Sequence, residues 1–591
     1  MLYTERVSPT RRLLGYLRRY RGRYAAGTGC LLLASAFSLG IPWTVKNAVD
    51  ALSHQGGGAA IGRGALAILL LAVGHGLARL ASRFAMLGAG QWVEHDVRAD
   101  LYAHLQTLPP AFYQRHRTGD LMSRASNDIS ALRGLAGFGS VMLVGTSFTF
   151  AGTIGAMWTI DPRLTLCALA PFPFLVLIAK RFNQDVHERS TAVQAQLGVV
   201  SARVQENLTG MAVVRAYTME QREIAEFEAS NRALLAGSVR LARTQAVSWP
   251  LMGLVSGLGA LIVLWLGGRA VMDGRISLGA FVAFNGYLAQ LAWPTIALGW
   301  TMATVRRGLA SMERVAEILD ARVDAGDGDG AVAPPRTAPR ALPPGDIEFR
   351  DLTFSYEGRP AALSGVSFRV RQGQLVAVVG PTGSGKSTLG LLLCRLFEPP
   401  RGTVLIGGVD VRDLPLDVLR RSVGYVPQEA FLFSRSLRDN VRLADDEADD
   451  ARVSAAASAA GLGEDVVAFP RGWDTVVGER GLSLSGGQRQ RAALARALVA
   501  EPPYLVLDDV LASVDAGKEW EILTSLRGAL SGRTTLLMTH RLRAAQEADW
   551  VVVLDEGRVA EAGGHAELLA AGRLYARLWR VQQLEDEVSL A

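Results

Sequence analysis

Residues 380–388 have the composition and spacing of a loop that binds a polyphosphate. In such a loop the glycines let backbone N–H groups wrap the phosphates, the lysine reaches the outer phosphates, and the serine after it can ligate Mg²⁺. The apolar run LVAVVG leads into this loop and the helical pattern TLGLLLCRLF follows it, so a helix N-terminus adds positive potential. The predicted phosphate contacts are Gly380, Pro381, Thr382, Gly383, Ser384, Gly385, Lys386, Ser387 and Thr388.

A second strand-like run, YLVLD, ends in two adjacent aspartates, Asp508 and Asp509. Asp508 is placed to hold the Mg²⁺ through water, together with Ser387. A phosphate loop with an aspartate after an apolar strand does not by itself separate transporters from GTPases or kinases. A further motif is needed to choose among these classes.

The stretch GERGLSLSGGQRQRAALARAL, residues 478–498, supplies that motif. Its LSGGQ segment opens a helix after a short polar approach, which predicts a second phosphate-facing helix N-terminus in the same domain. Two such surfaces on different elements of one domain suggest that two domains hold their nucleotides between them. The residues of the second surface are Ser485, Gly486, Gly487 and Gln488.

With these motifs in this order, nearly the whole sequence resembles a half-transporter of the ATP-binding cassette family, of the exporter type. The resemblance implies an α-helical membrane domain with six transmembrane helices, followed by an α/β P-loop ATP-binding cassette domain that uses ATP and Mg²⁺. It also implies that Tyr356 stacks on adenine and that Gln428 senses Mg²⁺ and contacts the membrane domain. Asp515 matches the family's D-loop aspartate, and His540 matches the switch histidine that meets the γ-phosphate.

Asp509 departs from the family pattern, which has a glutamate that polarises the attacking water through a contact within about 3 Å. The aspartate is shorter by one C–C bond, about 1.5 Å. We therefore expect slow hydrolysis at this chain's own site. The segment DDVLASVD also resembles the degenerate subunit of heterodimeric exporters, which implies a partner half-transporter with a glutamate at this position.

Two alternatives stay open beside the heterodimeric exporter. The retained His540 is compatible with a slow homodimer. An importer built on the same fold is compatible with every motif, because none of them specifies the direction of transport.

Of the 591 residues 49% are hydrophobic, which indicates that part of the chain lies in a membrane. A helical span needs about 20 apolar residues. Six runs are candidates, although the second is interrupted by arginines and the fourth is short. They are residues 25–45, 64–93, 134–160, 164–179, 244–268 and 276–305.

The positions of the arginines predict the orientation in the membrane. The N-terminal segment RRLLGYLRRYRGRY and the stretches 94–133 and 180–243 are rich in arginine, whereas the alternate loops are short. The positive-inside rule therefore places the N-terminus, both stretches and the C-terminal half in the cytoplasm. This explains most of the net charge of +6, so nucleic acid binding has no independent support. We expect a multi-pass protein of the cell membrane.

The expected boundaries are a membrane domain over residues 1–321, a Gly-, Pro- and Asp-rich linker over 322–345, and a nucleotide-binding domain over 346–591. The segment Gly119-Asp120-Leu121 and the stretch ENLTGMAVVRAYTME resemble the two cytoplasmic loops whose short helices couple these domains. The three cysteines show no metal-ligand spacing.

The substrate is not specified by any motif; a drug, lipid, peptide or siderophore is possible. We favour a lipophilic or amphipathic compound, because aromatic and amide side chains on the fifth and sixth spans could line a cavity for it; each of them could equally pack against other helices or lipid. These residues are Trp249, Phe284, Asn285, Tyr287, Gln290, Trp293 and Trp300. The second span carries Arg79 and Arg83, which we interpret as reaching toward water at the inner edge of the bilayer rather than as binding substrate. The role of His75 is left open.

Overall fold

The computed structural model describes the chain in two compact units. The first consists of Met1–Gln106 and Arg117–Ala321, and the second of Thr107–His116 and Arg322–Ala591. The expected linker therefore lies almost wholly outside the part of the chain that is described. The described residues are 8–53, 58–321, 342, 345–478, 481, 484–510, 526 and 528–590.

The first unit is entirely helical where it is described. Its elements are α1 (Pro9–Arg19), α2 (Arg21–Ser53), α3 (Gly58–Thr107), α5 (Thr118–Ser123), η1 (Arg124–Asp128), α6 (Ile129–Gly134), η2 (Leu135–Gly139), α7 (Ser140–Ile160), α8 (Pro162–Leu169), α9 (Phe172–Thr209), α10 (Met211–Ala216), α11 (Glu220–Ile262), η3 (Val263–Gly267), α12 (Gly268–Met272) and α13 (Leu278–Leu319).

Several of these helices are longer than a bilayer is thick. Helix α3 has 50 residues, which at 1.5 Å per residue is about 75 Å, more than twice the hydrocarbon core of about 30 Å. Part of α3 must therefore extend into water. Three described helical stretches are long and apolar enough to cross a membrane: Arg21–Leu52, Ile61–Thr107 and Thr118–Ile160. The count of six spans stays a prediction.

Asp161 forms the turn between α7 and α8. Its backbone is extended, and its carboxylate caps α8 by accepting a hydrogen bond from the N–H of Leu164 at 3.0 Å. Pro162 follows at the first helical position, where its missing N–H costs nothing. Asp161 and Pro162 therefore make a tight turn between the two helices.

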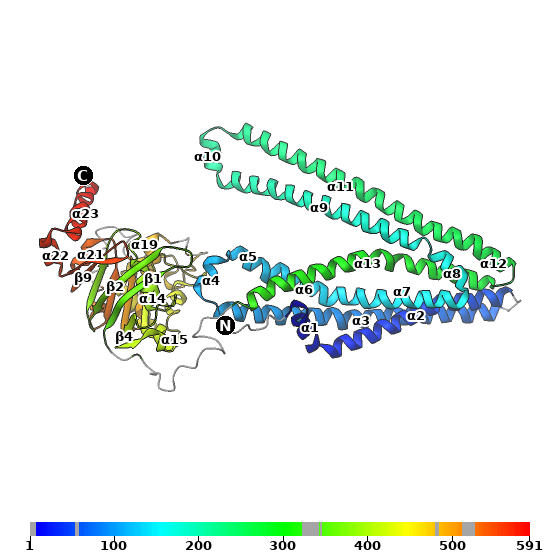
Figure 1. Cartoon of the computed structure of the whole chain (residues 1–591), viewed down its shortest axis with the longest axis horizontal. Coiled ribbons are helices and arrows are strands. Elements are labelled where there is room, and N and C mark those ends of the chain that lie inside the picture. The colour runs from blue at the N-terminus through cyan, green and yellow to red at the C-terminus, as the bar shows by residue number, and fades with distance from the viewer. Residues whose placement is uncertain are drawn as a thin grey trace. The chain divides into compact units, whose positions relative to one another are not determined.

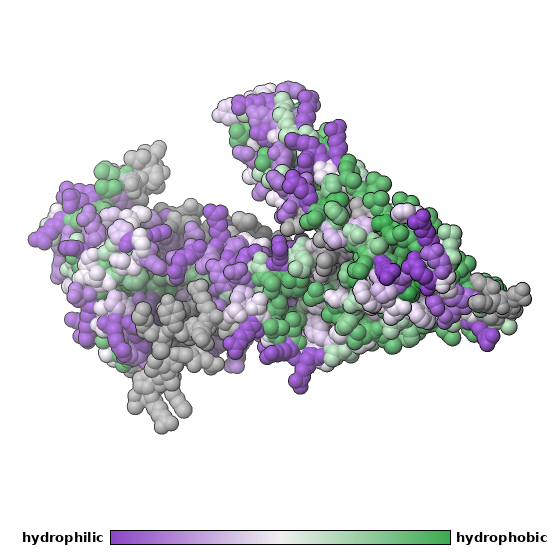
Figure 2. Space-filling model, turned by 45° about the vertical axis from the view of Figure 1, so that its right-hand side comes forward, coloured by the Kyte–Doolittle hydropathy of each residue, from purple (hydrophilic) through white to green (hydrophobic). Residues whose placement is uncertain are grey.

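Helices α9 and α11 form a long hairpin with α10 at its tip (Figure 1). Arg203 of α9 pairs with Glu226 of α11 at 2.8 Å, and the Gln196 side chain donates to the Ser230 carbonyl. Figure 2 shows hydrophilic residues gathered at the tip of the hairpin and hydrophobic residues toward its other end. The hairpin thus changes from polar to apolar along its length, as expected for helices that leave a bilayer.

The second unit contains two sheets. The four-stranded sheet has the order β2-β1-β4-β5 and is antiparallel; the six-stranded sheet has the order β10-β9-β3-β8-β7-β6. Strands β3, β8, β7 and β6 are parallel neighbours. The strands are β1 (Ile347–Ser355), β2 (Ala361–Val370), β3 (Leu375–Val379), β4 (Val404–Ile406), β5 (Val409–Asp410), β6 (Val423–Val426), β7 (Tyr504–Asp508), β8 (Thr534–Met538), β9 (Trp550–Asp555) and β10 (Arg558–Gly563).

The second unit also contains helices. They are α4 (Pro110–Arg115), α14 (Lys386–Leu393), α15 (Leu416–Ser422), α16 (Leu437–Arg442), α17 (Asp450–Ala459), α18 (Gly463–Ala468), α19 (Gly486–Val499), α21 (Leu542–Gln546), α22 (His565–Ala571) and α23 (Leu574–Leu590). Strand β7 is buried along its whole length, as is typical of a parallel strand covered on both faces. Helix α14 contributes Leu389, Leu392 and Leu393 to a core shared with both sheets. The sequence predicts an α/β domain but not a separate antiparallel sheet.

A buried carboxylate joins two helical segments of the first unit. Asp128, at the end of η1, is 7% exposed. It accepts hydrogen bonds from the Ser311 hydroxyl at 2.9 Å and from Nε of Arg314 at 2.8 Å, both on α13. These hydrogen bonds fix η1 against α13, two segments that are far apart in the sequence.

Replacing Asp128 by asparagine should lower the free energy of unfolding by about 1–2 kcal/mol, because the acceptor loses its charge and its hydrogen bonds with Arg314 become weaker. The loss is limited because Arg314 is half-exposed and keeps some of its hydration. Thermal unfolding of the detergent-purified protein, followed by tryptophan fluorescence, measures the effect. The control is Glu228→Gln, which removes an exposed pair with Arg232 on α11 and should change the stability by less than about 0.5 kcal/mol. Equal effects of the two substitutions would contradict the assignment.

Candidate nucleotide site

The loop between β3 and α14 has a conformation that only glycine permits at two positions. Gly380 has φ +153 and Gly385 has φ +97. A Cβ atom at Gly380 would lie 2.1 Å from the Leu554 carbonyl oxygen, and one at Gly385 would lie 2.5 Å from the Ala362 carbonyl oxygen. Both contacts are with backbone, which cannot move aside. The loop is therefore held in one shape by the strands around it.

Lys386, the first residue of α14, folds over this loop. Its ammonium group donates to the carbonyl oxygens of Gly380 at 2.8 Å and Pro381 at 2.9 Å. Burial lowers the pKa of Lys386, an effect that the negative charges of Asp509 and Asp508 oppose. Nearby anionic oxygens therefore stabilise the charged form of the lysine, as phosphates would.

Ser387 and Asp508 present two oxygen atoms suited to Mg²⁺. The Ser387 hydroxyl donates to Oδ1 of Asp508 at 3.1 Å. Hydroxyl and carboxylate oxygens are the hard ligands that Mg²⁺ prefers, and the ion commonly uses only one or two of them together with substrate phosphates. Burial raises the pKa of Asp508; the Ser387 hydrogen bond lowers it, the negative Asp509 raises it and Lys386 lowers it. The pair therefore fits a bound Mg²⁺.

The Asp509 carboxylate is surrounded by protein donors. Nδ1 of His540 lies 2.9 Å from Oδ1 and 2.8 Å from Oδ2. The Thr539 hydroxyl lies 3.4 Å from Oδ1, and Nε2 of Gln428 lies 3.5 Å from Oδ2. The structure thus brings together the residues that the sequence predicts as catalytic.

The backbone of Asp509 is also fixed. The residue has φ +50, in the left-handed region that aspartate tolerates better than most residues. Its N–H donates to the Met538 carbonyl at 2.7 Å, and the side chain is 7% exposed. The position of the carboxylate is therefore determined by the β7–β8 pairing.

Tyr356 stands beside the same loop. Its hydroxyl lies 3.1 Å from that of Thr388, and its ring meets Phe397 edge-on with centroids 5.1 Å apart. These contacts hold the ring near the N-terminal turn of α14. Stacking on adenine stays a prediction.

The LSGGQ segment forms the N-terminus of α19. Ser485 caps the helix: its hydroxyl accepts from the Gln488 N–H at 3.2 Å, and the Gln488 side chain accepts from the Ser485 N–H at 3.0 Å. Ser485 is exposed. No hydrogen bond or ion pair among the described residues joins this segment to residues 380–388. The two phosphate-facing surfaces of the chain are separate.

Two residues of this region were not predicted from the sequence, and one prediction lies outside the described residues. Thr539 contacts Asp509, and Nε2 of Gln490 donates to the backbone carbonyl of Gln428 at 3.2 Å. Gln490 follows the LSGGQ motif by two residues, which is the one signal that points to it. Asp515 falls in a segment that the structure leaves undescribed.

The predicted cavity side chains of the membrane half have different environments. Phe284 and Tyr287 are buried in the helical core, and Trp300 packs edge-on against Phe138. Gln290 and Trp293 line a cavity, together with His75 and Arg79. The Asn285 amide donates to the Phe281 carbonyl, and the side chain of Trp249 is not among those described.

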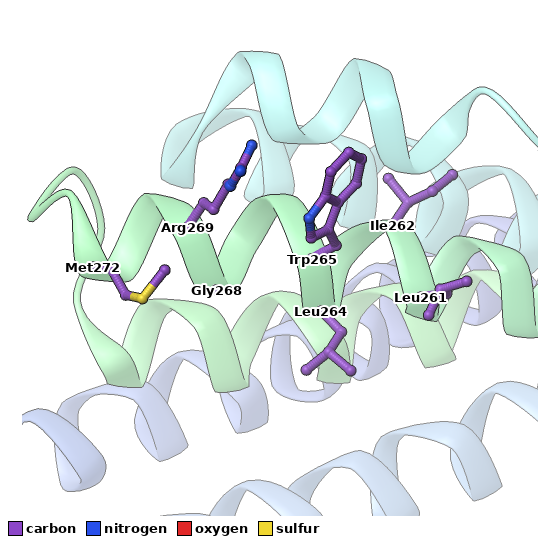
Figure 3. A pocket seen from close by; sticks show the side chains of 7 residues that line it. All are labelled: Leu261, Ile262, Leu264, Trp265, Gly268, Arg269 and Met272. Atoms are coloured by element: carbon purple, nitrogen blue, oxygen red, sulfur yellow. The ribbon is translucent and has the colours of Figure 1, made fainter.

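The helix formed by α11, η3 and α12 carries a second concave surface, with a volume of about 760 Å³ (Figure 3). Arg269 lies over the ring of Trp265, 5.4 Å from its centroid. The other lining residues are apolar, so the surface is suited to lipid or to another helix and offers no convergent polar groups. They are Leu261, Ile262, Leu264, Gly268 and Met272.

Comparison with known proteins gives consistent matches along the chain. Residues 24–295 match the family described as ABC transporter transmembrane region, and residues 363–512 match the family described as ABC transporter. The chain is 35% identical to a probable multidrug resistance ABC transporter ATP-binding/permease protein, YheI, of Bacillus subtilis, over 98% of both chains.

Two further matches have similar coverage. The chain is 33% identical to an ATP-dependent lipid A-core flippase of Syntrophus aciditrophicus, over 99% of this chain and 96% of the flippase. A solved bacterial Atm1-family ABC exporter with ATP bound superposes with a TM-score of 0.79 at 29% identity, covering 95% of this chain and 99% of that one.

Mg²⁺-dependent ATP binding should weaken as the pH falls, and the loss should begin at a higher pH than if Asp508 were exposed to solvent. The Asp508 carboxylate must be ionised to hold Mg²⁺, and burial raises its pKa above the ordinary value of about 3.9. ATP affinity, measured with and without Mg²⁺ at a series of decreasing pH values, should lose its Mg²⁺-dependent part as the pH falls. In Asp508→Asn the Mg²⁺-dependent part should be small at every pH; a wild-type profile in that variant would rule out Asp508 as the titrating group.

Proposed function

The chain belongs to the ABC transporter family, with an exporter-type transmembrane region fused to an ATP-binding domain, and from this premise we propose that it is the slow-hydrolysing half of a heterodimeric exporter. The family couples ATP hydrolysis to transport, uses ATP with Mg²⁺, and works as dimers in a lipid bilayer. The proposal concerns which subunit hydrolyses ATP and what is transported.

The observation that carries this proposal is the environment of Asp509. Both of its oxygens face protein donors, with Nδ1 of His540 at 2.8 and 2.9 Å. A water-orienting carboxylate needs a free lone pair within about 3 Å of the attacking water. Asp509 is one methylene shorter than the family's glutamate, and its backbone is hydrogen-bonded to β8. The carboxylate therefore has neither the reach nor the freedom to orient water well.

The intact LSGGQ segment has the opposite role. Its glycines and the capped N-terminus of α19 are suited to bind the γ-phosphate of a nucleotide held by another subunit. This chain would therefore complete a competent site in its partner, while its own phosphate loop holds ATP for long periods. The partner would carry a glutamate at the position of Asp509.

The transport mechanism that we propose is alternating access. Binding of ATP closes the two nucleotide-binding domains, the segments around α5 and α10 transmit the closure, and the membrane helices rearrange around a central cavity. Closure requires that the closed state bind nucleotide more tightly than the open state, since a ligand that binds both equally shifts nothing. Hydrolysis in the partner's site reopens the dimer.

The direction of transport and the class of substrate are proposed from the descriptions of the relatives. The relatives named above are described as a multidrug resistance protein, a lipid A-core flippase and an exporter, so we propose outward movement of a lipophilic or amphipathic compound. The arginine-rich segments support a cytoplasmic location for the N-terminus and the nucleotide-binding domain. A slow homodimer and an importer are alternative outcomes of the experiments.

In the complex with its co-purified partner, Asp509→Asn should change total ATPase activity by less than about twofold, because the working site lies in the partner. Asp509→Glu should raise the activity, because it restores a general base at this chain's own site, and such a base contributes about 10²-fold or more to the rate. A glutamine in place of the partner's glutamate should abolish most of the activity. The assay is steady-state phosphate release at saturating Mg·ATP.

The same preparation distinguishes the alternatives. A chain that dimerises with itself and loses at least about tenfold of its activity in Asp509→Asn would be a homodimer with a working aspartate, contrary to the proposal. Movement of substrate toward the nucleotide-binding domains in proteoliposomes would identify an importer.

A further inference from the structure

A cavity of about 200 Å³ lies inside the first unit, between α2, α3, α7 and α13. Helix surfaces that meet inside a bilayer are mostly apolar. Polar side chains there cost free energy, so those that occur usually serve a function. This cavity nevertheless gathers polar side chains from all four helices. They are Ser35, Ser38, His75, Arg79, Thr146, Thr149 and Gln290.

The Gln290 side chain leaves one hydrogen-bond acceptor unused. Its Nε2 donates to the Ser38 carbonyl at 3.2 Å, and because a carbonyl can only accept, the amide orientation is fixed. The other amide atom, Oε1, is buried and has no partner among the described residues. A buried unpaired acceptor is costly, and a ligand that donates an O–H or N–H would relieve that cost.

His75 is oriented by the same neighbouring helix. Its Nδ1 lies 2.9 Å from the Ala34 carbonyl, so Nδ1 carries the proton and Nε2 of the neutral ring is an acceptor. Ala34 and Ser38 are four residues apart on α2, so one face of α2 positions both His75 and Gln290. The polar groups at the cavity are thus held in place before any ligand arrives.

Arg79 adds a positive charge to the same cavity. It follows His75 by one helical turn, on the same face of α3. No carboxylate among the described residues forms an ion pair with its guanidinium. Arg83 lies one further turn along and does not line the cavity. Both arginines are exposed, but only Arg79 also lines the cavity.

The size of the cavity limits what part of a ligand it can hold. Sites that enclose a whole drug-sized molecule have volumes of about 300–1,000 Å³. A volume of about 200 Å³ suits a polar head group. The indole of Trp293, which also lines the cavity and is 62% exposed, provides an apolar surface for the remainder of the ligand.

We propose that this cavity binds the head group of the transported substrate, and that the substrate is an acidic amphipathic molecule that also carries an O–H or N–H donor. Arg79 binds the acidic group, Oε1 of Gln290 accepts from the donor, and the apolar body lies along Trp293. The inference rests on the proposed transport function and specifies its substrate class.

Three single-chain lipids separate the two requirements. Lysophosphatidylglycerol has an acidic phosphate and hydroxyls, a monoacylglycerol has hydroxyls without charge, and an ionised fatty acid has charge without a donor. Binding is measured by titration into the full chain with its co-purified partner in phosphatidylcholine nanodiscs. Lysophosphatidylglycerol should bind most tightly and should stimulate ATPase activity.

The variants assign the contacts. Arg79→Gln should weaken lysophosphatidylglycerol binding by at least about tenfold and leave monoacylglycerol binding unchanged, because only the charged hydrogen bond is lost. Arg79→Lys should restore part of the affinity. Gln290→Leu should weaken both hydroxylated lipids and not the fatty acid. The matched control is Arg83→Gln, which should have less than about a twofold effect.

Several results would overturn the proposal. One is an equal loss in Arg79→Gln and Arg83→Gln, which would indicate general attraction to a basic surface. Another is saturable binding that neither stimulates ATPase activity nor leads to ATP-driven movement of the lipid between leaflets, which would indicate a resident lipid. Basal ATPase activity reports on the nucleotide sites separately, so a failure here is distinguishable from a failure of the heterodimer proposal.

Discussion

The parallel pairing of β3, β8 and β7 is the constraint on which the nucleotide site depends. Parallel neighbours end at the same edge of a sheet, so three loops far apart in sequence meet there. The first is the glycine loop after Val379, the second contains Thr539 and His540, and the third begins at Asp508. A shift of one residue in the β7–β8 register would turn the side chains of β7 to the other face of the sheet. Asp508 and Asp509 would then be separated from Ser387 and His540.

Within that edge, neighbouring carboxylates have different surroundings. Asp508 is paired with a hydroxyl and kept from water by burial, which suits a metal ligand. Asp509 is only one residue further, but the left-handed turn directs it to His540. Two similar side chains thus have different surroundings, which suit the separate roles that we propose for them.

The sequence predicts the nucleotide site far better than the cavity in the membrane half. Glycines, lysine and aspartates have spacings imposed by phosphate and Mg²⁺, so the amino-acid sequence alone is enough to predict that residues 380–388 and Asp508 meet at one site. His75 and Arg79 lie one turn apart on α3 and Gln290 lies on α13, and no sequence spacing connects the two helices. Their proximity depends on how α2, α3 and α13 pack, which periodicity alone does not determine. The buried pair of Asp128 and Arg314 was missed for the same reason.

The uninterrupted length of α3 has a mechanical consequence. The helix contains no proline, and Arg79 lies 28 residues before its end at Thr107, a distance of about 42 Å. A rigid rod of that length converts a tilt of about 5° at one end into a displacement of about 4 Å at the other. Arg79 lies near the middle of α3 and Thr107 at its end, and the helix between them is continuous. Whatever occupies the space beside Arg79 therefore resists or assists the movement of the end at Thr107, and no hinge is needed to carry the signal.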